Sequence, residues 1–246
     1  MRMVKSLLAI MMVVALALPV AALATDPKVV GTGPVSTFPD SDTPVLYDQL
    51  ATPDGDATTA QNFEPAFDGY DNRLADDFIV PAGPGWDIDR VLFDGIYFNG
   101  FGPVVSVNVW IYGDSNCLKA GAPVYTGPGL PYVDPTGAGD LEVAISPPCL
   151  APGHYWLVVQ ANMDFGVGGQ WGWANNFDPH FCPAIWENPG GAFGIGCTTW
   201  SPRAAVCGID PIAPDQCFRL NGVPCQTTAV EASTWGRIKA NYPANP

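Results

Sequence analysis

One stretch of nine residues, VVSVNVWIY at positions 104–112, most narrows the folds open to this chain. Small apolar side chains alternate along it with polar or aromatic ones, and this period of two fits a β-strand rather than a helix. The side chains expected on the core face are Val105, Val107, Val109 and Ile111. Those expected on the opposite face are Ser106, Asn108, Trp110 and Tyr112. The stretch therefore predicts a strand with two different faces.

Similar short runs recur along the chain. Further strands are expected at 45–50, 77–80, 88–98, 141–145, 154–160 and 216–220. Turn signals separate them, as at 113–116, 127–131 and 135–139. With 27 glycines, 26 prolines and almost no helical periodicity, the pattern predicts an all-β fold. We expect one antiparallel β-sandwich, jelly-roll-like, over residues 45–222.

The two ends differ from this pattern. Residues 1–24 combine a basic start, an apolar run from Leu7 to Leu18 and the small residues Ala22-Leu23-Ala24, which is typical of a secretory signal peptide. The run is too short to span a membrane. Residues 25–44 are expected to form a flexible leader, and residues 223–246 a C-terminal tail with a short helix capped by Ser233 or Thr234. The sequence thus predicts an exported chain without a membrane span after cleavage.

The charge excludes one class of partner. After residue 24 the chain keeps eight basic residues against 24 acidic ones, a formal charge of −16. Nucleic-acid binding depends on basic patches that contact phosphates, so no nucleic-acid partner is expected. An acidic surface suits an extracellular protein and a calcium ligand set.

Seven cysteines in an exported chain predict disulfides. Proximity favours Cys197–Cys207, and Cys117–Cys149 is a weaker expectation. Both partners of the first pair lie in residues 177–214, a stretch too long for an ordinary connection, which we expect to be a disulfide-linked loop region. The odd cysteine predicts either a free thiol or a bridge to a partner chain. The sequence does not pair Cys182, Cys217 and Cys225.

Residues 168–173, GGQWGW, place two tryptophans two positions apart. In a strand, Trp171 and Trp173 share one face about 6–7 Å apart, and Asn175 continues that face with Asn176 beside it. Two interpretations fit. Coplanar rings beside amides suit a sugar-binding surface, where C–H bonds stack on indoles and amides bond hydroxyls. Tryptophan is also mostly buried, and the same rings suit a core.

Carboxylates gather in two turns before the strand expected at 77–80. Asp54 and Asp56 lie in DGD, and Asp68 and Asp71 lie in DGYDN. Calcium takes six to eight oxygen ligands from such loops, so these four aspartates are a candidate calcium site. Neither stretch completes the D-x-[DN]-x-[DN]-G spacing. The alternative is a pair of solvated turns that use Asp and Gly for their backbone conformations.

Motifs of common catalytic sites are missing from the sequence, among them G-x-S-x-G, H-E-x-x-H and the glycine-rich phosphate loops. His154 and His180 are the only histidines, and nothing near them in sequence pairs them with a nucleophile. We therefore predict a non-enzyme without catalytic residues. A hydrolase that uses a dispersed pair of carboxylates is a further alternative.

Four blocks of sequence are distinctive: YDNRLADDFIVP (70–81), YWLVVQANMDFGVGGQWGW (155–173), WENPGGAFGIGCTTW (186–200) and DQCFRLNG (215–222). In this order they resemble an uncharacterised β-rich module of secreted bacterial proteins, which occurs as repeats or C-terminal appendages of larger exported proteins, proteases included. The resemblance covers about residues 45–222. It implies a β-rich fold and no particular activity. Cys117 departs from it, standing where the module has glycine.

These observations favour a secreted or cell-surface module that acts by binding or adhesion. The expected partner of this module is an extracellular glycan or a surface protein. The most specific form of this hypothesis is sugar recognition through Trp171, Trp173, Asn175 and Asn176. The alternative is a structural or assembly component of an extracellular complex, with the odd cysteine or the tail contacting its partner.

Overall fold

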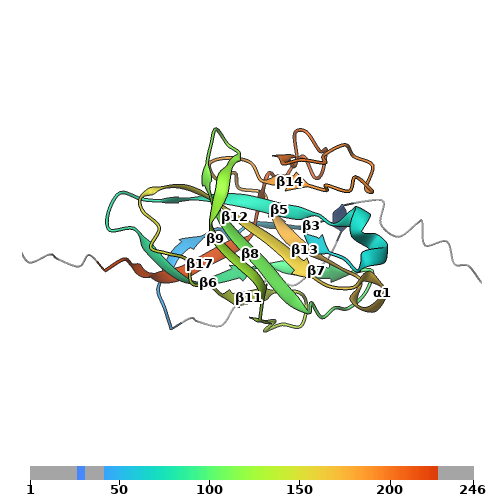
Figure 1. The fold of residues 1–246 in the computed structure, drawn as a ribbon, viewed down its shortest axis with the longest axis horizontal. Coiled ribbons are helices and arrows are strands. Elements are labelled where there is room, and N and C mark those ends of the chain that lie inside the picture. The colour runs from blue at the N-terminus through green and yellow to red at the C-terminus, as the bar shows by residue number, and fades with distance from the viewer. Residues whose placement is uncertain (1–26, 31–41, 227–246) are drawn as a thin grey trace, which may run out of the picture.

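A computed structural model describes residues 27–30 and 42–226, and within them the chain is a two-layered all-β structure (Figure 1). Nearly all strand pairs are antiparallel, which confirms the predicted sandwich. The exception is a short parallel pairing of β4 (Gln61–Asn62) with β12 (Gly153–Asn162). The predicted signal peptide and the predicted helix in the tail lie outside the described residues.

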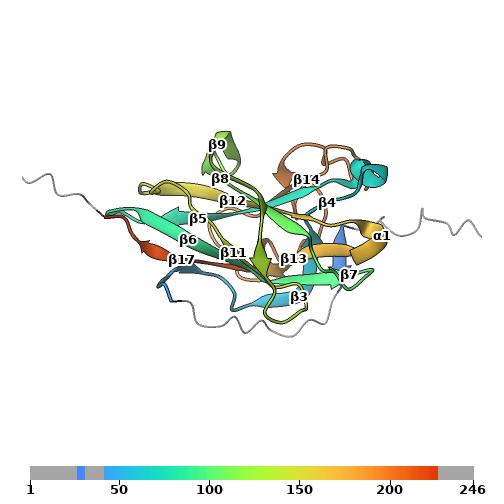
Figure 2. The same ribbon diagram turned by 60° about the horizontal axis from the view of Figure 1, so that its bottom comes forward.

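One layer is a seven-stranded sheet, seen uppermost in Figure 2. Its main path runs β15-β14-β5-β12-β8-β9, and β4 joins it beside β12. Its strands are β4 (Gln61–Asn62), β5 (Arg73–Val80), β8 (Ser106–Asp114), β9 (Lys119–Leu130), β12 (Gly153–Asn162), β14 (Ile185–Glu187) and β15 (Ser201–Pro202).

Two five-stranded sheets make up the other layer (Figure 2). The first contains β1 (Lys28–Val30), β3 (Pro53–Thr59), β7 (Gly95–Phe98), β13 (Gln170–Asn176) and β16 (Asp215–Gln216). The second contains β2 (Val45–Asp48), β6 (Trp86–Phe93), β10 (Tyr132–Val133), β11 (Leu141–Ala144) and β17 (Phe218–Pro224). Within residues 27–30 and 42–226, helical structure is limited to the 3₁₀ turn Pro65–Tyr70 and to α1 (Phe165–Gly168).

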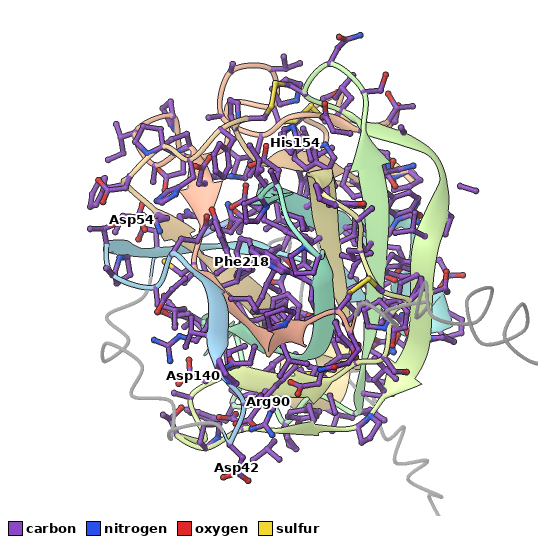
Figure 3. All side chains as sticks on the ribbon, turned by 90° about the vertical axis from the view of Figure 1, so that its left-hand side faces the viewer. Asp42, Asp54, Arg90, Asp140, His154 and Phe218 are labelled. Carbon is purple, nitrogen blue, oxygen red and sulfur yellow. A yellow bond between two sulfur atoms is a disulfide. The ribbon has the colours of Figure 1, made fainter. Side chains whose placement is uncertain are left out.

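The main core lies between the layers. The seven-stranded sheet contributes the predicted face of β8, with Val107, Val109 and Ile111 fully buried. Val105, expected on the same face, precedes the strand and is 77% exposed. The opposing layer contributes Phe218, whose side chain lies in the interior in Figure 3. Alternation along β8 therefore predicted the core side correctly once the strand begins.

The outer face of the seven-stranded sheet has a second, smaller core. Tyr112, Trp156 and Val158 pack there against Cys182 and Trp200 from the long loop region. β12 is therefore buried on both faces, because the loop region covers part of its outer side.

Several strands differ from the sequence predictions. Residues 127–131 were expected to form a turn, but β9 runs as a long edge strand through residue 130, with its glycines and prolines at largely exposed positions. β3 contains the DGD turn of the calcium prediction. β1 lies in the expected flexible leader and pairs with β3. Glycine and proline at sheet edges and bulges concealed these strands.

Of the two disulfides predicted from the sequence, one is confirmed and one is wrong. Cys197–Cys207 is a disulfide, as predicted. The expected Cys117–Cys149 pair is wrong, because Cys117 joins Cys182 and Cys149 joins Cys225 across 65 and 76 residues. Proximity in sequence does not predict such disulfides, because the sheet topology brings these distant cysteines together.

The odd cysteine, Cys217, is free and has no exposed surface. Its Sγ lies 3.5 Å from the carbonyl oxygen of Asn175, and burial raises its pKa. In this fold Cys217 therefore cannot form a disulfide with a partner chain. Separately, none of the described helices has the length and apolar character needed to cross a bilayer.

Trp173 provides a test of the core. Its ring has no exposed surface and packs edge-on against Phe93 and Phe218. Trp173→Ala should lower the free energy of unfolding by about 3–5 kcal/mol, measured by urea denaturation. Phe101→Ala is the matched control, because Phe101 is 96% exposed and its loss should change stability by less than about 0.5 kcal/mol. Equal small losses in both variants would contradict the packing.

Candidate functional site

The two tryptophans of GGQWGW belong to the core. Trp171 and Trp173 are fully buried on β13, which lies between β3 and β7. Their indole N–H groups donate to the carbonyl oxygens of Gly139 and Cys217, at 2.8 and 2.7 Å. The sugar-platform interpretation of these rings is wrong, because a ring without exposed surface cannot stack on a ligand.

The neighbouring asparagines are also structural. Asn175 and Asn176 are buried, and their amides bind other parts of the chain. The Nδ2 of Asn175 donates to Asp210 at 2.7 Å, and its Oδ1 accepts from Thr58 at 2.9 Å. The Nδ2 of Asn176 donates to the carbonyl oxygen of Gln49 at 2.6 Å. These amides hold β13 in place and do not face a ligand.

The four aspartates of the calcium prediction separate into two places. Asp54 and Asp56 lie with Asp210, and each offers a carboxylate oxygen within 4.8 Å of the others. Burial and a hydrogen bond with Asp210 raise the pKa of Asp54 to about 7. Asp68 and Asp71 join no such three-residue group among the described residues.

Asp68 and Asp71 line a cavity of about 270 Å³ instead. Asp68 is exposed at the 3₁₀ turn, whereas burial raises the pKa of Asp71, whose Oδ1 accepts from the backbone N–H of Phe63. The cavity opens on the outer face of the seven-stranded sheet. Its lining residues are Asp68, Asp71, Asn72, Arg73, Trp110, Gln160, Pro189 and Gly190.

The alternation of side chains along β8 and β12 puts polar residues on the outer face, where they form one wall of the cavity. The residues of β8 that face away from the core are those predicted from the sequence, and Trp110 among them is half-buried. In the pairing of β8 with β12, Asn108 lies opposite Gln160 and Ser106 opposite Asn162. The Nδ2 of Asn108 donates to Gln160 at 3.3 Å and to Asn162 at 2.9 Å. A row of linked amides thus begins at the cavity and continues along the sheet.

Arg73 fixes the aromatic wall. Its guanidinium lies 5.9 Å from the ring of Trp110 and 5.6 Å from that of Trp200, and it forms an ion pair with Glu187, its partner across the β5–β14 pairing. Lys119 lies 4.3 Å from the ring of Tyr112 and also contacts Trp200. Rings and cations therefore alternate along this face, and cation–π attraction holds the Trp110 ring in one position.

Sequence reasoning did not single out Trp110, Arg73, Gln160 or Asn72 as site residues. The usable signal was the polar face of the predicted strand at 104–112, since an exposed sheet face carrying Trp and amides suits a ligand. The contributions from the 3₁₀ turn and from Pro189 depend on tertiary folding and left no signal in the sequence.

A separate group of carboxylates is enclosed in the protein. Asp76 and Asp215 are fully buried, and Oδ2 of Asp76 accepts from Gln49 at 2.6 Å and from the backbone N–H of Gln216 at 2.8 Å. Oδ2 of Asp215 accepts from the backbone N–H of His180. Burial raises the pKa of both aspartates, and that of Asp215 reaches about 7. Without exposed surface, this carboxylate pair does not reach a substrate.

Comparisons with known proteins add little. No protein-family model matches the chain, and no curated protein is similar to it in sequence. The resemblance to the bacterial module stays a prediction. Among solved structures, the chain is similar to the cysteine protease and lectin-like domains of Cwp84, a surface layer associated protein of Clostridium difficile. The identity is 10%, the TM-score 0.41, and the match covers 76% of this chain and 37% of that one.

A second structure, the clostridial cysteine protease Cwp84 after propeptide cleavage, matches with 10% identity and a TM-score of 0.39 over 62% of this chain and 36% of that one. The chain thus spans little more than a third of the length of either structure. These values assign no function.

Asp215 predicts how stability depends on pH. Folding raises its pKa from the ordinary carboxyl range to about 7, so the folded state binds this proton more tightly than the unfolded state. The contribution is complete below about pH 4 and is lost as the pH rises through about 7. Urea denaturation should therefore show a lower free energy of unfolding at about pH 8 than at about pH 5.

Asp215→Asn keeps an oxygen acceptor for His180 and removes the titration. It should reduce that pH difference by about 1–3 kcal/mol. Asp178→Asn, an exposed substitution in the nearby loop, is the control and should leave the difference unchanged. A difference that is the same in both variants would rule out Asp215 as its source.

Proposed function

We propose that the chain is an exported, non-catalytic binding module that recognises a glycan at the cavity on the outer face of the seven-stranded sheet. The observation that carries the proposal is the cavity itself, in which the ring of Trp110 lies beside amides and carboxylates. Sugars need this combination, because their C–H faces stack on aromatic rings and their hydroxyls both donate and accept.

Rigidity supports the proposal. Trp110 stands on a strand within the sheet, and Arg73 contacts its ring. Little conformational freedom is then lost when a ligand stacks on it. The amides of Asn108, Gln160 and Asn162 extend the polar surface beyond the cavity along β8 and β12, which suits more than one sugar unit.

Three disulfides and the acidic surface support an extracellular or cell-surface location. Disulfides persist in oxidising compartments, and the predicted signal peptide gives a route to one.

Removing the ring tests the site. Trp110→Ala should weaken the binding of glycans found by array screening at least tenfold by calorimetry, about 1.4 kcal/mol, because stacking is lost. Trp110→Phe should keep an intermediate affinity. Phe101→Ala removes an exposed aromatic residue outside the cavity and should bind normally.

Circular dichroism must show that the Trp110 variants are folded. Binding that survives Trp110→Ala in a folded protein would exclude this cavity. A screen in which the wild-type chain binds no glycan would remove the proposal and move the search to protein partners.

We also propose that Asp54, Asp56 and Asp210 hold a calcium ion. Three carboxylates that offer oxygens within 4.8 Å of one another match the hard oxygen ligands calcium prefers, with backbone carbonyls and water completing the shell. The neighbouring Asn175 fixes the orientation of Asp210 by its 2.7 Å hydrogen bond. An ion here would offset the mutual repulsion of three charges and stabilise β3 against the loop region.

Calcium at about 100 times its Kd should then add about 2.7 kcal/mol to the free energy of unfolding, and chelator should reverse it. Calorimetry should show the melting temperature rise by roughly 5–10 °C. Asp54→Asn should abolish the rise. Asp68→Asn, which changes the other predicted acidic turn, should preserve it. A rise that persists in Asp54→Asn would place the ion elsewhere.

The alternative function, a structural or assembly component, is favoured by one observation. Phe101, Val105 and Val167 are 96%, 77% and 84% exposed, and their loops meet where the N–H of Gly102 donates to Gly168 at 2.9 Å. Exposed apolar side chains that cluster often mark a protein contact. A partner interaction lost on Phe101→Asp, in a chain that binds no glycan, would favour this function.

A further inference from the structure

His154 lies between two carboxylates at one end of the outer sheet face. Its Nε2 is 2.5 Å from Oδ2 of Asp77, and its Nδ1 is 3.5 Å from Oδ2 of Asp114. Figure 3 shows it across the molecule from Asp42 and well away from Asp54. The imidazole keeps about a quarter of its surface exposed, so it is reachable from solvent.

Asp77 is the buried member of this group. The residue has no exposed surface, and its Oδ2 also accepts from the backbone N–H of Cys182 at 2.9 Å. Its other oxygen, Oδ1, is buried and accepts no hydrogen bond from any residue in the described part of the chain. Buried carboxylate oxygens normally accept hydrogen bonds, so Asp77 keeps an unused acceptor in this group.

Cys182 places a sulfur atom at the same point. Its Sγ, a ring nitrogen of His154 and a carboxylate oxygen of Asp77 all lie within 4.8 Å of one another. In the oxidised chain this sulfur is bonded to Cys117, which stands on an exposed turn. A disulfide sulfur is not a metal ligand, whereas a thiolate is.

We propose that the Cys117–Cys182 disulfide masks a transition-metal site, and that the reduced chain binds zinc or a chemically similar divalent ion through Asp77, His154 and Cys182. Zinc–donor bonds of about 2.0–2.3 Å place tetrahedral donors roughly 3.3–3.8 Å apart. Here Nε2 of His154 and Oδ2 of Asp77 are 2.5 Å apart, and the three donors lie within 4.8 Å of one another, so small side-chain shifts would suit the ion. Mixed sulfur, nitrogen and oxygen donors favour zinc-class ions over calcium or magnesium.

The chemistry requires a reductant, which we take to be an external dithiol. It gives two electrons and two protons to the Cys117–Cys182 bond and becomes a cyclic disulfide, leaving two thiols on the chain. On metal binding, the Cys182 thiol releases its proton to solvent. The metal takes the place of the hydrogen bond between His154 and Asp77, any proton held there also leaves to solvent, and water fills the fourth position.

Asp114 acts as a positioning residue. Its Oδ2 faces the Nδ1 of His154, and its Oδ1 accepts from the indole N–H of Trp156 at 2.8 Å. With its proton on Nδ1, the ring directs the lone pair of Nε2 toward Asp77 and the metal. Carboxylates in this role commonly fix the orientation of a metal-bound histidine.

Two matched variants test the site with cobalt as the probe. Cys117→Ser and Cys182→Ser both remove the disulfide, but only Cys117→Ser leaves the thiol beside His154. The expected result is one Co²⁺ bound per chain in Cys117→Ser, with a thiolate-to-cobalt charge-transfer absorption that zinc abolishes by displacement. Cys182→Ser and the oxidised wild-type chain should lack that absorption.

His154→Gln in the Cys117→Ser background should weaken cobalt binding at least 100-fold, and Asp114→Asn about 10-fold. Should Cys117→Ser fail to fold, wild-type protein reduced at Cys117–Cys182, with the reduction mapped by mass spectrometry, should give the same absorption. Absence of the charge-transfer band from the reduced chain, or equal cobalt binding by Cys182→Ser, would overturn the proposal.

Discussion

The register between β8 and β12 determines which side chains face the main core and which face the outer surface of the seven-stranded sheet. With Val109 opposite Val159 and Asn108 opposite Gln160, one face of the pair closes the main core and the other becomes a wall of amides and rings. A shift of one residue in either strand would move that strand's side chains to the opposite face of the sheet. Packing of the core thus also fixes where the candidate site lies.

The long loop region then divides the outer face into separate environments. Its residues enter each candidate site: Pro189 and Gly190 line the cavity, Asp210 joins the acidic group, and Cys182 lies beside His154. Arg203 fastens the region from inside. Fully buried, its guanidinium donates to the side chain of Thr58 and to the carbonyl oxygens of Ile209 and Ala213. Burial lowers the pKa of this arginine to about 10. The long loop region, which has few strands, is thereby held in place by the buried guanidinium of Arg203.

The fold class was predictable because alternation is a local property. Val107 and Ile111 revealed their face in nine residues of sequence, whereas β9, with its glycines and prolines, showed no comparable signal. The candidate site was less predictable. Trp173 and Trp110 both lie on alternating strands, and only their positions in the sheets decide that one is buried and the other lines a cavity. The same limit applies to Cys117 and Cys182, which only the topology brings together.

The disulfide between Cys149 and Cys225 lies at the end of β17, beside the N–H···O contact from Cys225 to Gly85. β17 pairs with β6 along most of its length, and its last residue lies opposite Trp86. Tension applied to the chain beyond Cys225 would otherwise unzip these hydrogen bonds one after another, starting at that end. Because the bridge carries part of the load directly into the loop before β12, the sheet must shear as a unit or the sulfur–sulfur bond must break. The domain is therefore mechanically reinforced in the direction of its C-terminal tail.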